Sequence, residues 1–427
     1  MPEESGGKPW PPGPAALSGT PGAVGAPGAP AGPRLFPARL PMLPRLRLSA
    51  CHRQAAGSTA TEADWLDVLV RPGGAAALVI GHAEGPSGQI AAAVARVRAG
   101  LQEQLRAGMA PAEVLARLAA AVRGSPGIRA ATASLVVLDP ATGQLRYAST
   151  GQPWPVICGP AGTDGWLARS AGEPAAPGAR PPEPGTAVLP AGAVVLLYCG
   201  RPGLTDRESP AEGAREVADA ILPALAGEGR AADADLADRV GPAALAGLTG
   251  DGGAATVLAA YRLRAPVPGW SMNLPAEPLA LRQLRVRLHD WLRELGAAAS
   301  DRTDLELAVW EAAVNAIVHG RPPAGDATVT VCASLDDAGR AVIQVSDRGR
   351  WQPPGSADPG RAWPGGQGLS VIRQATDELD IEPGTAGTTV TMRRALSRPV
   401  QGAAQPGEHA AQPGEYPATA ARHGRPA

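Results

Sequence analysis

The sequence predicts an α+β protein with two folded domains, and two observations carry this prediction. Apolar runs typical of strands alternate with segments of helical periodicity from about residue 35 to residue 396. A chain of 427 residues has room for two or three domains of about 150 residues each. The expected strands of the first domain are AAALVIG (75–81), ATASLVVLD (131–139), QLRYAS (144–149) and AVVLLYCG (193–200).

Two helices are expected between these strands. The segment from Gln89 to Arg106 has apolar residues at three- and four-residue spacing, and these are Ile90, Val94, Val97, Leu101 and Leu105. Pro111 begins a second such segment, PAEVLARLAAAVR, because proline suits the first turn of a helix. Strands and helices in this order indicate a layered α+β domain over 35–264.

Both ends of the chain have a different composition. Residues 1–34 and 397–427 consist mostly of Pro, Gly and Ala, with few bulky apolar side chains. Such segments bury too little surface to offset the entropy lost on ordering, so we expect both to be disordered. The composition of RAPVPG predicts a short linker at 265–269, after which a second domain occupies 270–396.

Charge and cysteine content limit the function classes. The net charge is -1, from 39 basic and 40 acidic residues, which excludes a global field that favours nucleic acid or an anionic membrane. Lys8 is the only lysine, which indicates a GC-rich, actinobacterial-like genome. The four cysteines lack C-x-x-C spacing, which argues against a disulfide framework or a zinc site. With no long apolar stretch and no leader, we expect a cytoplasmic protein.

The segment DLELAVWEAAVNAIVHG (304–320) combines an apolar helical face with a polar one. The polar residues Glu311, Asn315 and His319 recur every four positions, so they share one side of the helix. The expected apolar face consists of Leu307, Trp310, Ala313, Val314 and Ile317.

Three further motifs follow this helix. A strand-like AVIQVSD (341–347) ends in Asp347, Arg348 and Gly349. The glycine turn of GGQGLSVI (365–372) leads into a helix, and GTTVTMRR (387–394) is expected as a closing strand.

These motifs, in this order, resemble the GHKL ATPase superfamily, specifically the anti-sigma kinases related to RsbW and SpoIIAB. The helix motif E-x-x-x-N-A-x-x-H-G is matched at Glu311, Asn315, Ala316, His319 and Gly320. The resemblance implies a two-layer α/β sandwich that binds ATP and Mg²⁺. In such a site Glu311 is the catalytic base and Asn315 offers a hard oxygen to Mg²⁺.

The remaining nucleotide contacts come from the same resemblance. Asp347 would accept a hydrogen bond from the adenine amino group, and Thr388 is a second adenine contact. Glycine lets the backbone approach the nucleotide, and a helix N-terminus directs N–H groups at phosphate. The full nucleotide-binding set is Asn315, His319, Asp347, Gly349, Gly366, Gly368, Leu369 and Thr388. Trp351 departs from the D-x-G-x-G pattern of many relatives.

Residues 35–264 resemble the SpoIIE/RsbU branch of PPM-type phosphatases, which implies an α/β/β/α sandwich. The resemblance runs from LFPARLPMLPRLRLSA (35–50) through ADWLD (63–67) to LDPATGQLRYASTGQPWPVI (138–157). These phosphatases hold two Mn²⁺ or Mg²⁺ ions with aspartates from several loops.

Several of those aspartates are missing from this chain. His82 stands where the family's G-D-V-x-G-H-G motif has its Asp, and Cys199-Gly200-Arg201 replaces the acid of Y-T-D-G-L, with Asp206 nearby. Gly252 and Gly253 replace the final Asp pair. Asp64, Asp67 and Asp251 remain as a weak relic site, with Glu84 near them. We therefore expect an inactive phosphatase with no Mn²⁺ or Mg²⁺ of its own.

The expected function is regulation of a sigma factor by partner switching. The resemblance implies a serine/threonine kinase acting on a STAS-type anti-anti-sigma protein, with a sigma factor as a further partner and a homodimer left open. One alternative is an active metal-dependent phosphoserine phosphatase with a regulatory ATP-binding domain. Another is a non-catalytic module in which ATP only gates partner binding. A histidine kinase is disfavoured because 35–264 is rich in strands instead of carrying a dimerising helix with a phospho-acceptor His.

Overall fold

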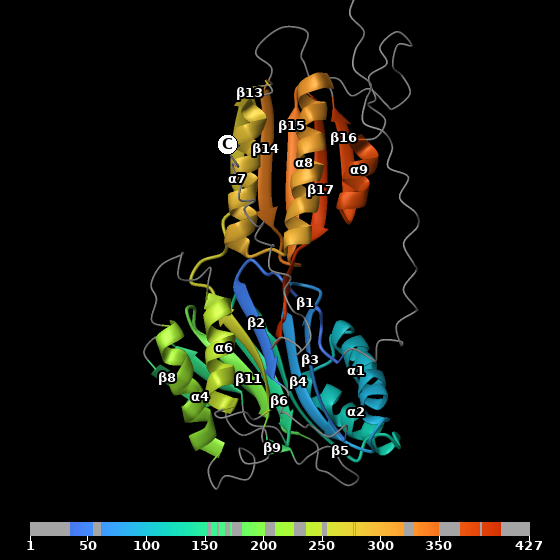
Figure 1. Ribbon diagram of the computed structural model, residues 1–427, viewed down its shortest axis with the longest axis vertical. Helices are drawn as coiled ribbons and strands as arrows, with labels where there is room; N and C mark the ends of the chain where they lie inside the picture. Colours follow the sequence, from blue (N-terminus) through green and yellow to red (C-terminus); the bar gives the residue numbers. More distant parts are fainter. Residues whose placement is uncertain are drawn as a thin grey trace, which may run out of the picture.

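The computed structural model describes two domains between residues 35 and 402 (Figure 1). The described residues are 35–53, 61–151, 155–159, 162–166, 171–172, 182–200, 210–225, 236–249, 254–275, 277, 279–319, 328–349, 368–384 and 387–402. The predicted disorder of 1–34 and of 403–427 lies outside these residues. Within the described part, no helix is long and apolar enough to cross a membrane.

Two β-sheets stacked face to face form the middle of the N-terminal domain (Figure 1). One sheet has the order β10 (Gly185–Val188), β6 (Gln144–Thr150), β5 (Ala130–Leu138), β4 (Ala76–Glu84) and β3 (Glu62–Val70), with β9 (Ala171–Gly172) beside β6. The other has the order β19 (Gln401–Gly402), β2 (Leu46–Arg53), β12 (Ala255–Arg262), β11 (Val194–Gly200), β7 (Val156–Gly159) and β8 (Gly162–Trp166).

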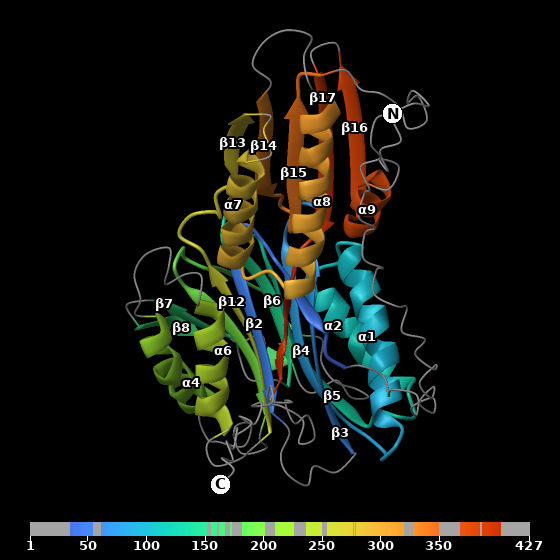
Figure 2. The same cartoon turned by 45° about the horizontal axis from the view of Figure 1, so that its top comes forward.

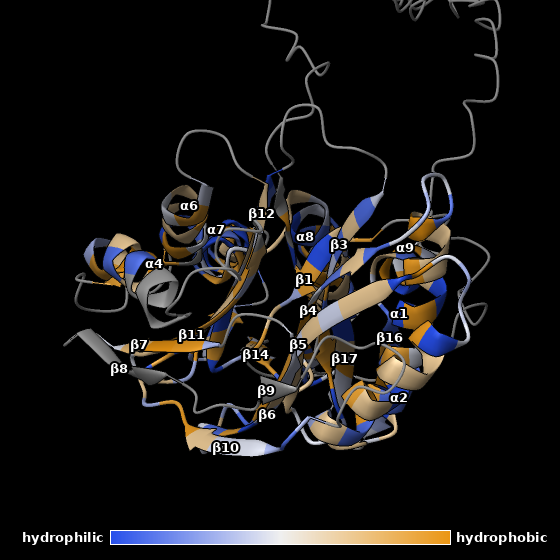
Figure 3. Ribbon diagram, turned by 90° about the horizontal axis from the view of Figure 1, so that it is seen from below, coloured by the Kyte–Doolittle hydropathy of each residue, from blue (hydrophilic) through white to orange (hydrophobic). Residues whose placement is uncertain are grey.

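A pair of helices covers the outer face of each sheet. The helices α1 (Ile90–Arg106) and α2 (Pro111–Arg123) pack on the first sheet. The helices α4 (Pro210–Leu225) and α6 (Leu236–Thr249) pack on the second, and Figure 3 shows the two pairs on opposite sides. This is the predicted α/β/β/α sandwich, and the predicted strands and helices coincide with β4, β5, β6, β11, α1 and α2.

Strand β4 shows why its sequence is a continuous apolar run. Alternate side chains of a strand point to opposite faces. Leu78 and Ile80 lie in the core between the sheets, whereas Ala77 and Val79 lie in the core under α1 and α2. Because both faces are covered, both sets are apolar.

The C-terminal domain has one antiparallel sheet with helices on one face (Figures 1 and 2). The strand order is β13 (Trp270–Pro275), β14 (Thr328–Leu335), β15 (Arg340–Asp347), β17 (Gly387–Ala395) and β16 (Glu378–Gly384). The helices are α7 (Ala280–Leu295), α8 (Ala299–His319) and α9 (Gly368–Ala375). This arrangement confirms the predicted two-layer α/β sandwich.

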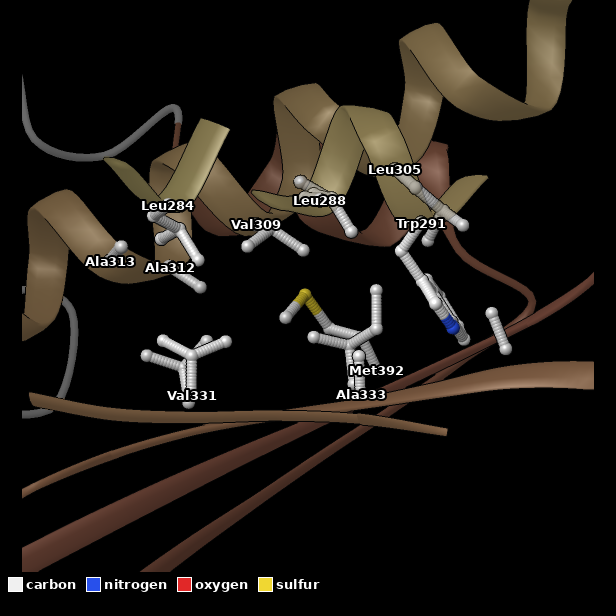
Figure 4. Packing of buried hydrophobic residues seen from close by; sticks show 14 of the residues in the cluster. Leu284, Leu288, Trp291, Leu305, Val309, Ala312, Ala313, Val331, Ala333 and Met392 are labelled. Carbon is white, nitrogen blue, oxygen red and sulfur yellow. The ribbon is translucent and has the colours of Figure 1, made fainter. Parts of the chain in front are cut away.

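The predicted apolar face of α8 is confirmed in part, since three of its five residues are buried or partly buried against the core: Ala313, Val314 and Ile317. Leu305, Val309 and Ala312 point from α8 into the core above the sheet, as Figure 4 shows. Leu307 and Trp310, which the sequence places on the apolar face, are 46% and 38% exposed. The true apolar face is offset because many of its members are alanines, which contribute little to a pattern read from large side chains.

The end of the C-terminal domain returns to the N-terminal one. β18 (Ser397–Pro399) pairs antiparallel with β1 (Arg39–Pro41), and β19 pairs parallel with β2 at Cys51 and His52. Residues 397–402 therefore belong to the folded part, although the sequence assigns them to the disordered tail. Backbone hydrogen bonding, which composition does not reveal, orders them.

Candidate functional site

The predicted catalytic residues lie where α8 meets the start of α9. Glu311 and Asn315 are one helical turn apart, and both face Gly368, the first residue of α9. A methyl group added to Gly368 would lie 3.1 Å from Oε2 of Glu311 and 3.4 Å from Nδ2 of Asn315. The structure therefore brings together a carboxylate, an amide and the free N–H groups of a helix N-terminus, a combination suited to phosphate and its cation.

Asp347 lies at the end of β15, opposite Thr388 of β17. The backbone N–H of Gly349 donates to Oδ1 of Asp347 at 2.7 Å, and the N–H of Thr388 also donates to this carboxylate. Burial raises the pKa of Asp347, and the two N–H donors partly offset that rise. The carboxylate is thus held in one orientation by backbone groups.

Gly387 is a residue of this site that the sequence reasoning missed. Its φ is +147°, and a side chain there would lie 1.8 Å from the carbonyl oxygen of Asp347. Only glycine lets β17 begin this close to β15. The one sequence feature that could have indicated Gly387 is its position as the first residue of the expected strand 387–394.

Other predicted nucleotide contacts are described only in part. Leu369 is half-buried against the core of the C-terminal domain, and Thr388 is buried. Gly366 and Trp351 lie outside the described residues, as does the side chain of His319.

In the N-terminal domain, Asp64 joins the two sheets at the expected phosphatase site. Its Oδ1 is 2.8 Å from Nδ1 of His82 on the neighbouring strand β4. Its Oδ2 accepts a hydrogen bond of 2.8 Å from Oγ1 of Thr256 on β12, in the opposite sheet. Both carboxylate oxygens therefore have protein partners.

The structure does not place Asp67 with Asp64, contrary to the predicted relic site. Residues three apart on a strand face opposite sides. Asp67 lies under α1, where Nε and Nη2 of Arg98 donate to it at 2.6 and 2.7 Å and Gln102 donates at 2.7 Å. Asp251, the third predicted member, lies outside the described residues.

The groups around Asp64 have perturbed proton affinities. Burial acts to lower the pKa of His82, but the hydrogen bond and charge of Asp64, with the charges of Glu62 and Glu84, raise it overall. Burial also raises the pKa of the Cys199 thiol well above its usual range, so this side chain is a neutral thiol near neutral pH. His52 differs, because burial lowers its pKa.

Only part of the expected phosphatase centre is described, since Asp206 and Asp251 lie outside the described residues. Hard divalent cations prefer several carboxylate oxygens, and here the oxygens of Asp64 are already engaged. Among the described residues, no three His, Cys, Asp or Glu side chains are grouped to hold a metal ion.

Comparison with known proteins agrees with this two-domain organisation. Residues 72–253 match the family of stage II sporulation protein E (SpoIIE), and residues 274–394 match the histidine kinase-like ATPase domain. The chain is therefore a fusion of a SpoIIE phosphatase-like domain with an ATP-binding, histidine kinase-like ATPase domain.

Two relatives share one or both of these domains. The crystal structure of the RsbU and RsbW domains of Rv1364c from Mycobacterium tuberculosis superposes with a TM-score of 0.70 at 28% identity, over 86% of this chain and 98% of that chain. The anti-sigma F factor of Heyndrickxia coagulans is 27% identical over 122 residues, which are 26% of this chain and 82% of that protein. This chain is thus similar to an RsbU/RsbW fusion.

Proposed function

We propose that the C-terminal domain is an ATP-dependent serine/threonine kinase of the anti-sigma type, whose substrate is a STAS-fold anti-anti-sigma protein. The observation that carries this proposal is the convergence of Glu311 and Asn315 on the backbone of Gly368. Similarity to an anti-sigma F factor and to an RsbW domain supports it. A sigma factor is the second proposed partner.

Each residue has a defined task in this proposal. The amide oxygen of Asn315 holds the Mg²⁺ that accompanies the triphosphate, and Asp347 accepts a hydrogen bond from adenine. Glu311 accepts the proton of the substrate hydroxyl as its oxygen bonds to the γ-phosphorus. The bond from that phosphorus to the ADP oxygen breaks in the same transfer. Backbone N–H groups at the start of α9 stabilise phosphate charge.

We also propose that the N-terminal domain has lost phosphatase activity. The support is His82, whose imidazole binds Asp64 at 2.8 Å and occupies the neighbourhood that a cation would need. A protonated imidazole repels divalent cations. Release of phosphate from a phosphorylated STAS protein that depends on Mn²⁺ would instead favour the active-phosphatase alternative.

Replacement of Glu311 tests the kinase proposal. With labelled ATP and a cognate STAS protein, we expect Glu311→Gln to lower the rate of partner labelling by about 100-fold or more, since a general base contributes about that much. Nucleotide affinity, measured by calorimetry, should stay close to that of the unsubstituted protein.

Glu306→Gln is the matched control, because Glu306 lies on the same helix but bonds His289 instead of facing Gly368. Labelling that survives Glu311→Gln contradicts the assigned base. Nucleotide binding without any labelling of the partner favours the ATP-gated binding module.

A further inference from the structure

Each domain inserts a short segment into the other. Met42, which follows β1, is 4% exposed and belongs to the hydrophobic core of the C-terminal domain. In return, Val400, between β18 and β19, packs against the core between the two sheets of the N-terminal domain. The strap, defined as residues 396–402, runs beside β1, with the N–H of Met42 donating to the Leu396 carbonyl at 3.2 Å. Figure 1 shows the end of the chain passing from one domain to the other.

Asp301 is the point where the strap, β1 and α8 meet. Its side chain is 3% exposed, and Oδ2 accepts bonds from the backbone N–H and hydroxyl of Ser397 at 3.0 and 2.8 Å. Oδ1 accepts from Arg39 of β1 at 3.2 Å and from Arg394 of β17 at 3.3 Å. A buried carboxylate is stable only when such donors replace its water.

This contact ties the first turn of α8 to the N-terminal domain. Asp301 and Glu311 are ten residues apart on one helix, a distance of about 15 Å at 1.5 Å per residue. A helix of this length moves nearly as a rigid body. The orientation of Glu311 and Asn315 therefore depends on what holds Asp301.

The other end of the strap reaches the Asp64 site. β19 pairs with Cys51 and His52 of β2, and His52 lies opposite Thr256 in the register of β2 and β12. Thr256 in turn donates to Asp64. Arg398 of the strap also forms an ion pair with Asp238 of α6. One continuous set of bonded groups thus links α8 to the Asp64 site.

We infer that Asp301 is a positioning residue that couples the two domains: it holds α8 on the strap, so that nucleotide bound at α8 and α9 stabilises the β2 edge of the N-terminal domain. The N-terminal domain then helps to set the orientation of the ATP site. This inference depends on nucleotide binding by the C-terminal domain but not on phosphoryl transfer.

Hydrogen exchange of the full chain, with and without a non-hydrolysable ATP analogue and Mg²⁺, tests the coupling. In the unsubstituted protein the analogue should slow amide exchange in 46–53 by about fivefold or more, a coupling of ordinary size. Asp301→Asn should remove most of this slowing while the analogue still binds. Absence of slowing in the unsubstituted protein, or equal slowing in Asp301→Asn, overturns the inference.

Asp304→Asn is the matched control. Asp304 lies one turn along α8 and bonds Arg394 at 2.6 Å, but it touches neither Arg39 nor Ser397 in any bond of the described residues. The Asp304→Asn protein should still show slowed exchange in 46–53 when the analogue is bound. Loss of this slowing in Asp304→Asn would overturn the specific role of Asp301.

A second substitution covers the case in which Asp301→Asn fails to fold. Arg39 is 48% exposed, so Arg39→Gln removes the bond from β1 to Asp301 at little structural cost. It should lower the slowing, and unchanged slowing in a folded Arg39→Gln protein overturns the inference. If the analogue slows exchange in 46–53 but the STAS protein is not labelled, only the kinase proposal is contradicted. If the analogue binds without slowing exchange there, only this inference is contradicted.

Discussion

At the scale of single residues, His82 stands against Asp64 at a position where the resemblance to PPM-type phosphatases implies an Asp. His82 bonds Asp64 directly, and Thr256 bonds the same carboxylate from the opposite sheet. The His82 bond thus joins two neighbouring strands of one sheet, and Thr256 links the same carboxylate to the other sheet. Because the imidazole is titratable, the His82–Asp64 pair depends on pH.

We predict that His82→Gln changes the shape of the stability profile against pH. The pKa of His82 is raised in the folded state, so its ion pair contributes fully below the unfolded pKa of about 6.5. The contribution is lost as the pH rises through the folded pKa. The difference in free energy of unfolding between the two proteins, from urea titrations, should be largest near pH 6 and decline in alkaline buffer. A difference that grows with pH would contradict the assignment.

At the scale of elements, the alternation of β3 separates two aspartates that the sequence places three residues apart. Asp64 faces the opposite sheet, whereas Asp67 faces α1 and accepts two bonds from Arg98. Asp67 is therefore part of the packing between strand and helix.

We predict a large loss of stability for Asp67→Ala. The side chains of Asp67 and Arg98 are 6% and 12% exposed, and removing one partner of such a buried pair costs about 3–5 kcal/mol. The midpoint of urea unfolding should fall accordingly, while Glu84→Ala, at an exposed acid at the end of β4, should leave it nearly unchanged. A small effect at Asp67 would mean that Arg98 finds another partner or solvent.

At the scale of the whole molecule, the exchange of Met42 and Val400 makes the stability of each domain depend on the other. Two domains joined only by the linker 265–269 would unfold separately. The linker itself is held, because the N–H of Val267 donates to the Pro44 carbonyl at 2.8 Å and Val267 packs against both cores.

We predict that Met42→Ala lowers the stability of the C-terminal domain, although Met42 belongs to the N-terminal one. Loss of a buried methionine costs about 2–5 kcal/mol. The temperature at which bound nucleotide analogue is released should fall. Met109→Ala is the control, since Met109 packs under the helices of the N-terminal domain. Equal release temperatures for Met42→Ala and the unsubstituted protein would show that the domains unfold independently.

The sequence alone determined the features that depend on local pattern. The strands over 75–81 and 131–139, the helix carrying Glu311 and Asn315, and the two-domain order follow from periodicity, turn residues and motif spacing. These features depend on which face of a segment is apolar over a few helical turns or strand residues. The local sequence is therefore enough to predict them.

Only the tertiary structure decided which side chains meet. It separated Asp67 from Asp64, exposed Leu307 and Trp310, and ordered residues 397–402 on strands β1 and β2. Each outcome depends on partners far apart in the chain: Arg98 for Asp67, and β1 for the strap. Such contacts form because buried charges and buried backbone groups require hydrogen-bonding partners. The sequence shows that these groups need partners, but the partner is determined only by the tertiary fold.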